Sequence, residues 1–371
     1  MQKSLRWIRR NAAYGPLAAH SVGYVGEVSK EQLASERYQN FRQGDRVGQF
    51  GIEQAYDTLI RGVPGQKWIE VNVVGQELNL LRINKPVEGD DIFLTLDLDL
   101  QKVAEEALGE EAGSIVAIDP TNGEILALVS HPAFNPNDLS EGTSAGTLLS
   151  LLNDKGRPLM NRAGLGKPTG IPLASEKSGL IPSTVWKQKV LKEPWYPGET
   201  LSVSIGQGYV LVTPLQMAAM ISAVANDGIL YTPRLLLKSK SRQTGEYQAV
   251  PVATGAKVPI SKETLGIIKS ALADVVATPH GTAYGSRSAL IPFAGKTGTA
   301  QVVVMKKGEV KKALSKEVND HAWFVSYAPV DNPKIAVVVL VEHGGHGGSA
   351  AAPLAKRVIE AYLAPSKQPS L

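Results

Sequence analysis

Two pairs of alternating apolar segments, one in the first half of the chain and one near its C-terminus, restrict the possible folds more than any other feature. The first pair, residues 114–119 and 124–130, flanks Pro120-Thr121-Asn122-Gly123, in which Asn-Gly suits a tight hairpin turn. The second pair, residues 321–327 and 335–341, flanks a turn with two prolines. A long, largely helical stretch separates the pairs, and we expect them to meet in one antiparallel sheet.

Helices are predicted before and between these strands. The first is capped by Asp97 or Asp99 and ends at Gly109, with apolar residues at helical spacing between them. Another begins at Thr213, has Pro214 in its first turn and is apolar on almost all sides, which predicts a buried helix.

Two more helices and a fifth strand complete the pattern. Residues 262–276 follow a Ser261 cap, and residues 351–363 follow the glycine-rich loop 344–348. A strand is expected to start at Lys296. Together these elements predict an α+β fold with one five-stranded antiparallel sheet, covered by the first and last helices on one face and by the helical block on the other.

The N-terminal part differs from the rest. Residues 1–95 are irregular, and Gly and Pro interrupt short strand-like runs such as residues 68–74. This pattern predicts a small pedestal or linker module.

Composition excludes several function classes. The chain has 371 residues, no cysteine, a net charge of +4 and scattered basic residues. The absence of cysteine excludes disulfides, thiolate metal sites and cysteine nucleophiles, and it fits either the cytoplasm or a bacterial periplasm. Nucleic-acid binding is not expected without a basic stripe. No run of 18 apolar residues and no signal peptide are present, so we expect no anchor or export signal in the chain as written.

The segment GKTGTAQVV, residues 295–303, is the strongest candidate for part of an active site. Lys296 supplies a cation, and the hydroxyls of Thr297 and Thr299 can hold a carboxylate beside it. Gly298 removes a side chain where another group must approach the backbone. A phosphate-binding loop shares three of these residues, but its first glycine is missing and a strand follows where that motif needs a helix.

Longer segments carry a resemblance over nearly the whole chain. The chain resembles the class B penicillin-binding proteins, and among them the elongation-type penicillin-binding protein 2. The matching segments are YGPLAAHSVGYVGEVS (14–29), VGQFGIEQAYDTLIRGVPG (47–65), LTLDLDLQKVAEEAL (94–108), SIVAIDPTNGEILALVSHPAFNPN (114–137), GLGKPTGI (164–171), SGLIPST (178–184), WYPGETLSVSIGQG (195–208), TPLQMA (213–218), GKTGTAQVV and EHGGHGGSAAAP (342–353).

The resemblance implies two domains. Residues 1–95 would be a partial pedestal domain of the dimerisation type, used for partner binding. Residues 96–366 would be a transpeptidase domain of the serine β-lactamase-like fold, with the five-stranded sheet predicted above.

The resemblance also implies a peptidoglycan D,D-transpeptidase that cross-links stem peptides during cell-wall elongation. Enzymes of this kind use S-x-x-K, a second serine motif and K-T-G. Lys296 would then tune the site electrostatically. Thr297 and Thr299 would hold the substrate carboxylate, with the Thr299 backbone N–H as one of two oxyanion donors. Gly298 and Gln301 would complete this wall of the site.

The nucleophile motif is absent from this sequence. No lysine has a serine three positions before it, and neither S-x-N nor S-x-D occurs. The nearest approaches are Thr184 before Lys187 and Thr254 before Lys257. In the family, the segment that ends here at Ala163 leads toward the nucleophile helix, whereas Gly164 starts a segment that follows the second serine motif. A block is therefore expected to be missing between residues 163 and 164.

Three explanations compete. The chain is a truncated or spliced form of a transpeptidase, which has also lost its membrane anchor. Alternatively, it is a catalytically inert scaffold of the cell-wall elongation complex. The third explanation uses Thr184 as a nucleophile with Lys187 as its base.

By resemblance, the partners are D-Ala-D-Ala stem peptides, β-lactams, a SEDS-family glycan polymerase and other elongation-complex proteins, and the location is the bacterial inner membrane facing the periplasm. No cofactor is implied. His343 and His346 suggest a metal pair, but a third ligand is missing nearby, which favours a loop role. Trp195 and Tyr196 are open to two interpretations, a substrate groove or core packing.

Overall fold

The computed structural model describes residues 2–3, 14–72, 76–136, 167–173, 176–204, 207–258, 260–301 and 319–364. Contacts divide the chain into two compact units. The first unit comprises Met1–Leu94, Asn135–Leu149 and Leu236–Pro251, and the second comprises Thr95–Phe134, Ser150–Leu235 and Val252–Leu371.

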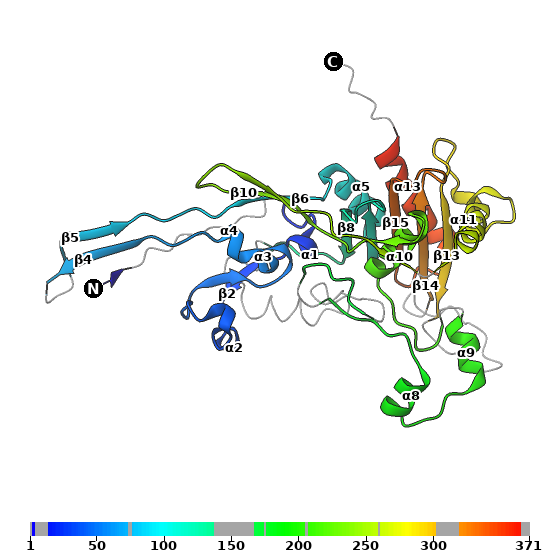
Figure 1. Ribbon diagram of the computed structural model, residues 1–371, viewed down its shortest axis with the longest axis horizontal. Coiled ribbons are helices and arrows are strands. Elements are labelled where there is room, and N and C mark those ends of the chain that lie inside the picture. The colour runs from blue at the N-terminus through cyan, green and yellow to red at the C-terminus, as the bar shows by residue number, and fades with distance from the viewer. Residues whose placement is uncertain are drawn as a thin grey trace, which may run out of the picture. The chain divides into compact units, whose positions relative to one another are not determined.

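The second unit contains a five-stranded antiparallel sheet (Figure 1). Its order is β13-β14-β15-β7-β8, and every neighbouring pair is antiparallel. The strands are β13 (Ala294–Ala300), β14 (His321–Ala328), β15 (Ile335–Val341), β7 (Gly113–Ile118) and β8 (Ile125–His131). Both predicted hairpins are confirmed, and they share one sheet as the alternating pattern predicted.

Two helices cover one face of this sheet. They are α5 (Leu98–Leu108) and α13 (Ala352–Leu363). The Asp97 carboxylate accepts hydrogen bonds from two backbone amides of the first turn of α5, and Gly109 ends the helix at a φ of 58°. A glycine suits this position because a side chain disfavours positive φ.

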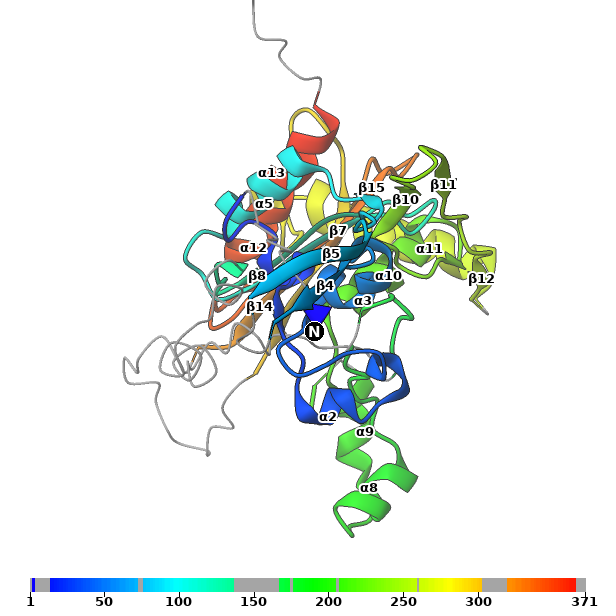
Figure 2. The ribbon, with the colours of Figure 1, turned by 90° about the vertical axis from the view of Figure 1, so that its left-hand side faces the viewer.

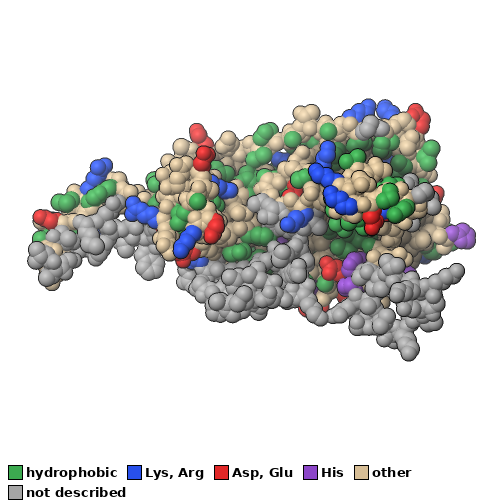
Figure 3. Space-filling view, turned by 90° about the horizontal axis from the view of Figure 1, so that it is seen from below, with side chains coloured by type: hydrophobic (Ala, Val, Ile, Leu, Met, Phe, Trp, Pro, Cys, Tyr) green, Lys and Arg blue, Asp and Glu red, His purple; other side chains and the backbone are tan. Residues whose placement is uncertain are grey.

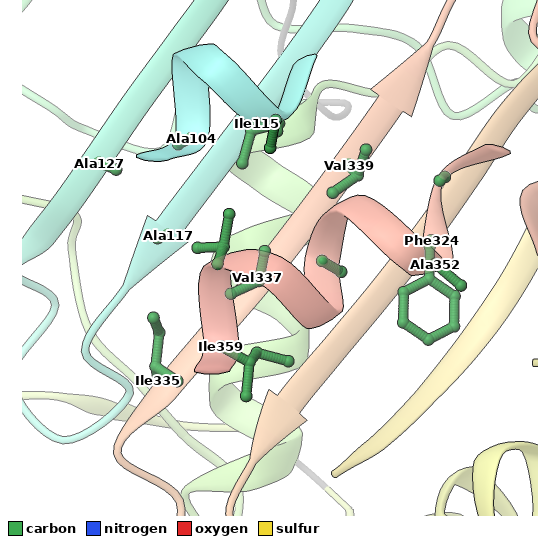
Figure 4. Close-up of a cluster of buried hydrophobic side chains, with 14 of the residues drawn as sticks. Ala104, Ile115, Ala117, Ala127, Phe324, Ile335, Val337, Val339, Ala352 and Ile359 are labelled. Carbon is green, nitrogen blue, oxygen red and sulfur yellow. The ribbon is translucent and has the colours of Figure 1, made fainter. Parts of the chain in front are cut away.

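Apolar side chains from these helices and the sheet form the core of the second unit (Figure 4). Burial of each large aliphatic side chain stabilises the fold by about 1.5–3 kcal/mol relative to exposure. Members of this core include Leu100, Ala104 and Leu108 of α5, Ile115 and Ala117 of β7, Val337 and Val339 of β15, Phe324 of β14, and Val358 and Ile359 of α13.

The opposite face is covered by α10 (Pro214–Ala225), which packs on β7, β14 and β15. Thr213 caps it by accepting a hydrogen bond from the Gln216 amide. The prediction of a buried helix is confirmed for most of its length, but Met220 is 44% exposed. The next helix, α11 (Lys262–Ala277), has the predicted Ser261 cap and packs on β13.

The second unit also contains short elements around the sheet. In both ribbon views α8 and α9 lie apart from the five strands (Figures 1 and 2). These elements are α8 (Thr184–Val190), α9 (Pro197–Ser204), β9 (Ile229–Leu230), β12 (Ala256–Lys257), η2 (Tyr284–Ser286) and α12 (Gly347–Ala350).

The first unit is built from small sheets and short helices. Its sheets have the orders β1-β4-β5, β2-β3 and β11-β10-β6. Val28, Tyr38 and Val47 form a small core beside β2 and β3. The elements are β1 (Gln2–Lys3), α1 (Ala19–Val22), β2 (Val25–Glu27), α2 (Lys30–Leu33), η1 (Glu36–Tyr38), β3 (Arg46–Gly48), α3 (Gly51–Ala55), α4 (Asp57–Ile60), β4 (Gln66–Val71), β5 (Glu77–Asn84), β6 (Asp91–Leu94), β10 (Leu236–Lys240) and β11 (Tyr247–Ala249).

The start of β13 differs from its sequence-based prediction. The strand expected to start at Lys296 starts two residues earlier, at Ala294, so the lysine lies inside β13. The expected missing block between residues 163 and 164 lies outside the described residues.

On the face drawn in Figure 3, basic and acidic side chains are interspersed.

Candidate active site

The candidate site is the outer edge of β13, the first strand of the five-stranded sheet. β13 has one strand neighbour, β14, which leaves its other edge unpaired by any described strand. The Lys296 side chain is exposed, whereas Thr297, Gly298 and Thr299 are half-buried. Gln301 is exposed and directly follows the strand. The predicted site residues therefore lie together along one sheet edge.

Lys296 places a positive charge at this edge. Its Nζ donates to the carbonyl oxygen of Thr297 at 2.7 Å. An ammonium group carries three donors, so this hydrogen bond leaves donors for an anionic ligand. Charge-assisted hydrogen bonds to a carboxylate are about twice as strong as neutral ones.

Thr297 adds a hydroxyl beside this charge. Its Oγ1 lies 2.8 Å from Oγ1 of Thr282, a residue in the connection between α11 and β13. The sequence did not single out Thr282, because nothing in its local pattern indicates a contact with the strand.

Thr299 is contacted from a distant segment. The side-chain amide of Gln207 donates to the Thr299 carbonyl oxygen at 2.9 Å. Because β14 is the only described strand beside β13, this hydrogen bond indicates that the Thr299 carbonyl faces the outer edge. The N–H and C=O of one residue point to the same side of an antiparallel strand, so we infer that the Thr299 N–H faces this edge as well.

Gly298 lies against the backbone at the start of α12, and the glycine that permits this approach is Gly347. A Cβ on Gly347 would come within 2.7 Å of the Gly298 carbonyl oxygen and 2.1 Å of the Trp323 carbonyl oxygen, whereas a Cβ on Gly298 would lie 3.1 Å from the Trp323 Cβ. Side chains at this point would force α12 away from β13 and β14.

Two histidines lie at the far end of β13. His321, which pairs with Ala300, accepts a hydrogen bond at Nδ1 from the His343 backbone N–H at 3.0 Å. Burial, together with the neighbouring His343 ring, lowers the pKa of His321 below its ordinary value. The His343 Nδ1 lies 3.0 Å from the Asn319 carbonyl oxygen. Among the described residues, no group of three or more potential ligands surrounds either histidine or any other point.

The geometry argues against Thr184 as a nucleophile activated by Lys187. Lys187 is 1% exposed, and its Nζ lies 2.5 Å from Glu199 Oε1 and 3.5 Å from Glu193 Oε2. Burial lowers the pKa of Lys187, but the hydrogen bonds and charges of the two glutamates outweigh it and raise the pKa above its ordinary value. A lysine held in its charged form cannot accept a proton from the Thr184 hydroxyl.

Tyr196 and Trp195 belong to the same α8–α9 region. Tyr196 is 53% exposed, and its ring centroid lies 4.3 Å from Nζ of Lys187. Trp195 lines an open depression of about 540 Å³ together with Thr184 and other α8 residues. Tyr196 therefore contacts the buried lysine, and neither aromatic residue belongs to the core of the sheet.

Family models match both parts of the chain. The model for the penicillin binding protein transpeptidase domain matches residues 147–360, and the model for the penicillin-binding protein dimerisation domain matches residues 4–94. The transpeptidase match covers more than half of the chain.

Known proteins are similar over almost the whole length. The peptidoglycan D,D-transpeptidase MrdA of Haemophilus influenzae is 30% identical, with 96% of this chain and 70% of that protein covered. MrdA of Escherichia coli is also 30% identical, with 91% and 69% covered. The structure of Pseudomonas aeruginosa PBP2 with WCK 5153 superposes with a TM-score of 0.74 at 27% identity, covering 95% of this chain and 90% of that one. Helicobacter pylori PBP2, in its complex with MreC, has a TM-score of 0.76 at 28% identity, covering 94% and 78%.

The alignment with the Haemophilus protein is longer than the part of this chain that takes part in it. The comparison with the Haemophilus protein spans 454 positions, whereas 96% of the 371 residues, about 356, takes part in it, which leaves about 98 positions without a residue of this chain. The coverage of the relatives, the two family matches and the five-stranded sheet all indicate the same family. The chain therefore belongs to the class B penicillin-binding proteins, in the group of the peptidoglycan D,D-transpeptidase MrdA and penicillin-binding protein 2.

Proposed function

We propose that the outer edge of β13 binds the C-terminal carboxylate of D-Ala-D-Ala stem peptides in cell-wall elongation. Lys296 supplies the charge, and the hydroxyls of Thr297 and Thr299 donate to the carboxylate oxygens. Gln301 extends the same edge toward the rest of the peptide. The observation that carries this proposal is the exposed Lys296, followed by half-buried Thr297 and Thr299, on a strand edge that no described strand pairs with.

The Thr299 backbone N–H fits the role of an oxyanion donor. The contact from Gln207 indicates that this residue faces the outer edge. A pre-positioned donor of this kind lowers the barrier of acyl transfer by roughly 3 kcal/mol. That contribution requires an attacking nucleophile.

The 371-residue polypeptide supplies the binding wall and lacks the S-x-x-K serine. We propose that cross-linking belongs to a form of the protein that carries the serine block, missing here between residues 163 and 164. The roughly 98 alignment positions without a counterpart fit a block of this kind. Residues 1–95 would act as the pedestal and residues 96–366 as the transpeptidase domain.

A second candidate function is that of an inert scaffold. The absence of the serine motif, together with a folded first unit, favours it. The Helicobacter relative forms a complex with MreC, and another similar structure concerns a peptidoglycan synthase complex that coordinates polymerization and crosslinking. By analogy, the partners would be MreC-like proteins and a SEDS-family polymerase at the inner membrane, on its periplasmic side. Among the described residues no helix has the length and apolarity to cross a bilayer.

Ligand-observed NMR with N-acetyl-D-Ala-D-Ala tests the first function. We expect saturable binding of the free acid and at least tenfold weaker binding of the C-terminal amide, since the amide removes the charge that Lys296 recognises. Equal affinity for both peptides, or no binding of either, would contradict the proposal. Binding of a soluble MreC-type domain in the absence of peptide binding would instead support the scaffold.

A further inference from the structure

A threonine outside the lysine-containing strand contacts the proposed carboxylate site. The hydroxyl oxygens of Thr282 and Thr297 lie 2.8 Å apart, within hydrogen-bond distance. Either oxygen can donate in the free protein. Thr282 is exposed, and Thr297 is half-buried.

A bound carboxylate removes this ambiguity. An ionised carboxylate only accepts hydrogen bonds, so Thr297 must use its single O–H to donate to the ligand. The Thr297 oxygen is then free to accept, and Thr282 becomes the donor of the 2.8 Å hydrogen bond. Thr282 then donates to Thr297, and Thr297 donates to the carboxylate. The two hydrogen bonds form a chain in which each strengthens the other.

The backbone holds Thr282 firmly in place for this role. A Cβ on Gly281 would lie 2.2 Å from the Val275 carbonyl oxygen in the last turns of α11, so the chain there packs directly on the helix. On the other side, a Cβ on Gly348 would lie 2.2 Å from the Thr282 carbonyl oxygen. The next residue, Ala283, is 1% exposed and donates to the Val275 carbonyl oxygen at 3.0 Å.

The methyl group and the hydroxyl of Thr297 face different segments. A Cβ on Gly348 would lie 3.6 Å from the Thr297 Cγ2, so the methyl group faces the start of α12. The hydroxyl faces Thr282. Because its hydroxyl already contacts Thr282, Thr297 loses little side-chain freedom when a ligand binds.

We propose that Thr282 is a positioning residue of the β13 carboxylate site, which donates to Thr297 and directs the Thr297 O–H toward the carboxylate of the bound peptide. The inference rests on the proposed function of β13. It adds a residue from the α11–β13 connection to a site otherwise formed by the K-T-G strand.

The test compares the affinity of N-acetyl-D-Ala-D-Ala for four variants and the unmodified chain. Thr282→Val, which keeps the shape of the side chain, is expected to weaken binding about fivefold, the value of one ordinary hydrogen bond. Thr282→Ser is expected to restore the affinity because it keeps the hydroxyl. Thr297→Val is expected to weaken binding at least as much as Thr282→Val. Thr244→Val in the β10–β11 connection is the matched control and is expected to have no effect.

The outcomes separate this inference from the proposed function. If Thr297→Val weakens binding and Thr282→Val does not, the role of Thr282 is wrong and the carboxylate site stands. If Thr282→Ser is as weak as Thr282→Val, the residue acts through packing, which also overturns the inference. If the unmodified chain does not prefer the acid over the amide, both proposals fail. The residual affinity for the amide is expected to be the same in the unmodified chain and in Thr282→Val, since the chain of hydrogen bonds ends on the carboxylate.

Discussion

The side-chain amide of Gln207 donates to the backbone carbonyl oxygen of Thr299 at 2.9 Å, across 92 positions of sequence. The hydrogen bond ties the segment before α10 to the outer edge of β13. It occupies a carbonyl that a peptide added along this edge would otherwise reach, as in β-strand addition. Gln207 therefore belongs to the candidate site, where it holds the strand edge that carries Lys296, Thr297 and Thr299.

Replacing Gln207 is expected to lower the free energy of unfolding, because the hydrogen bond to the edge of β13 is lost. Gln207→Ala removes the donor, and we expect the free energy of unfolding to fall by about 1 kcal/mol, as for an average hydrogen bond. Gln207→Glu is expected to be at least as unstable, because a carboxylate presents only acceptors to the carbonyl. Urea denaturation measures both, with Gln188→Ala on the exposed surface of α8 as a control. A Glu variant as stable as the unmodified chain would contradict the contact.

Neutralising Lys296 is expected to weaken peptide binding without unfolding the sheet. Its side chain is exposed and makes one described hydrogen bond, so Lys296→Gln leaves the core unchanged. Loss of a charge-assisted hydrogen bond costs about 1.5–3 kcal/mol, so the affinity for N-acetyl-D-Ala-D-Ala is expected to fall at least tenfold. Lys334→Gln, in the turn between β14 and β15, is the control for a change in net charge. Equal losses in the two variants would show that the effect is nonspecific.

His321 is expected to make stability depend on pH below neutrality. Its Nδ1 accepts from the His343 N–H, so protonation there breaks the hydrogen bond. Because burial lowers its pKa, the unfolded chain takes up the proton first, and the contribution to stability is complete above the ordinary value of 6.5 and is lost as the pH falls through the folded pKa. Besides His343, Asp320 and Glu342 act on this ring, and both raise its pKa.

The measurement for His321 is the urea midpoint at pH 7.5 and at pH 5.5. His321→Asn keeps an acceptor without a titrating ring and is expected to show a smaller difference between the two pH values. The exposed His280→Asn is the matched control and is expected to retain the full difference. The account of His321 is wrong if the two variants behave alike.

The contact of Glu199 with Lys187 is expected to hold α8 and α9 together. The hydrogen bond from Lys187, followed by that from the Tyr196 amide, lowers the pKa of Glu199 below its ordinary value of 4.5. Its contribution to stability is therefore present above pH 4.5 and is lost as the pH falls through the folded pKa. Hydrogen exchange of the α8 amides is expected to speed up in this acidic range.

Glu199→Gln provides the comparison for this prediction. It is expected to expose the α8 amides already at pH 7 and to lose the acid-induced change. Glu176→Gln, which removes a carboxylate elsewhere in the second unit, serves as the control. If the α8 amides of Glu199→Gln exchange at pH 7 as slowly as those of the unmodified chain, the contact with Glu199 does not stabilise α8.

The elements of the second unit follow from local sequence signals. Asp97, Thr213 and Ser261 cap the helices that their positions predicted, because capping involves only the next few residues. The hairpins follow from alternation and turn chemistry. The start of β13 was predicted two residues too late because Ala294 and Gly295 carry no β-type side chain, yet Gly295 lies directly opposite Ser326 in the sheet.

The contacts that shape the site were not predictable in the same way. Thr282 reaches Thr297 because two glycines let the α11–β13 connection approach α11 and α12, which a local pattern does not reveal. The partnership of Lys187 with Glu199 likewise depends on how α8 and α9 fold against each other. The K-T-G strand was predictable because its cation and its hydroxyls are adjacent in the sequence and need no contact with distant segments to be identified.

Equilibrium dialysis against radiolabelled benzylpenicillin, followed by denaturation, tests the central claim most directly, since it measures both the binding wall and the absence of a nucleophile. The ligand carries a carboxylate that Lys296 and the two threonines can hold. The account predicts label bound to the native 371-residue chain and complete release of that label on denaturation. Label that stays attached after denaturation, or a native chain that binds none, would contradict it.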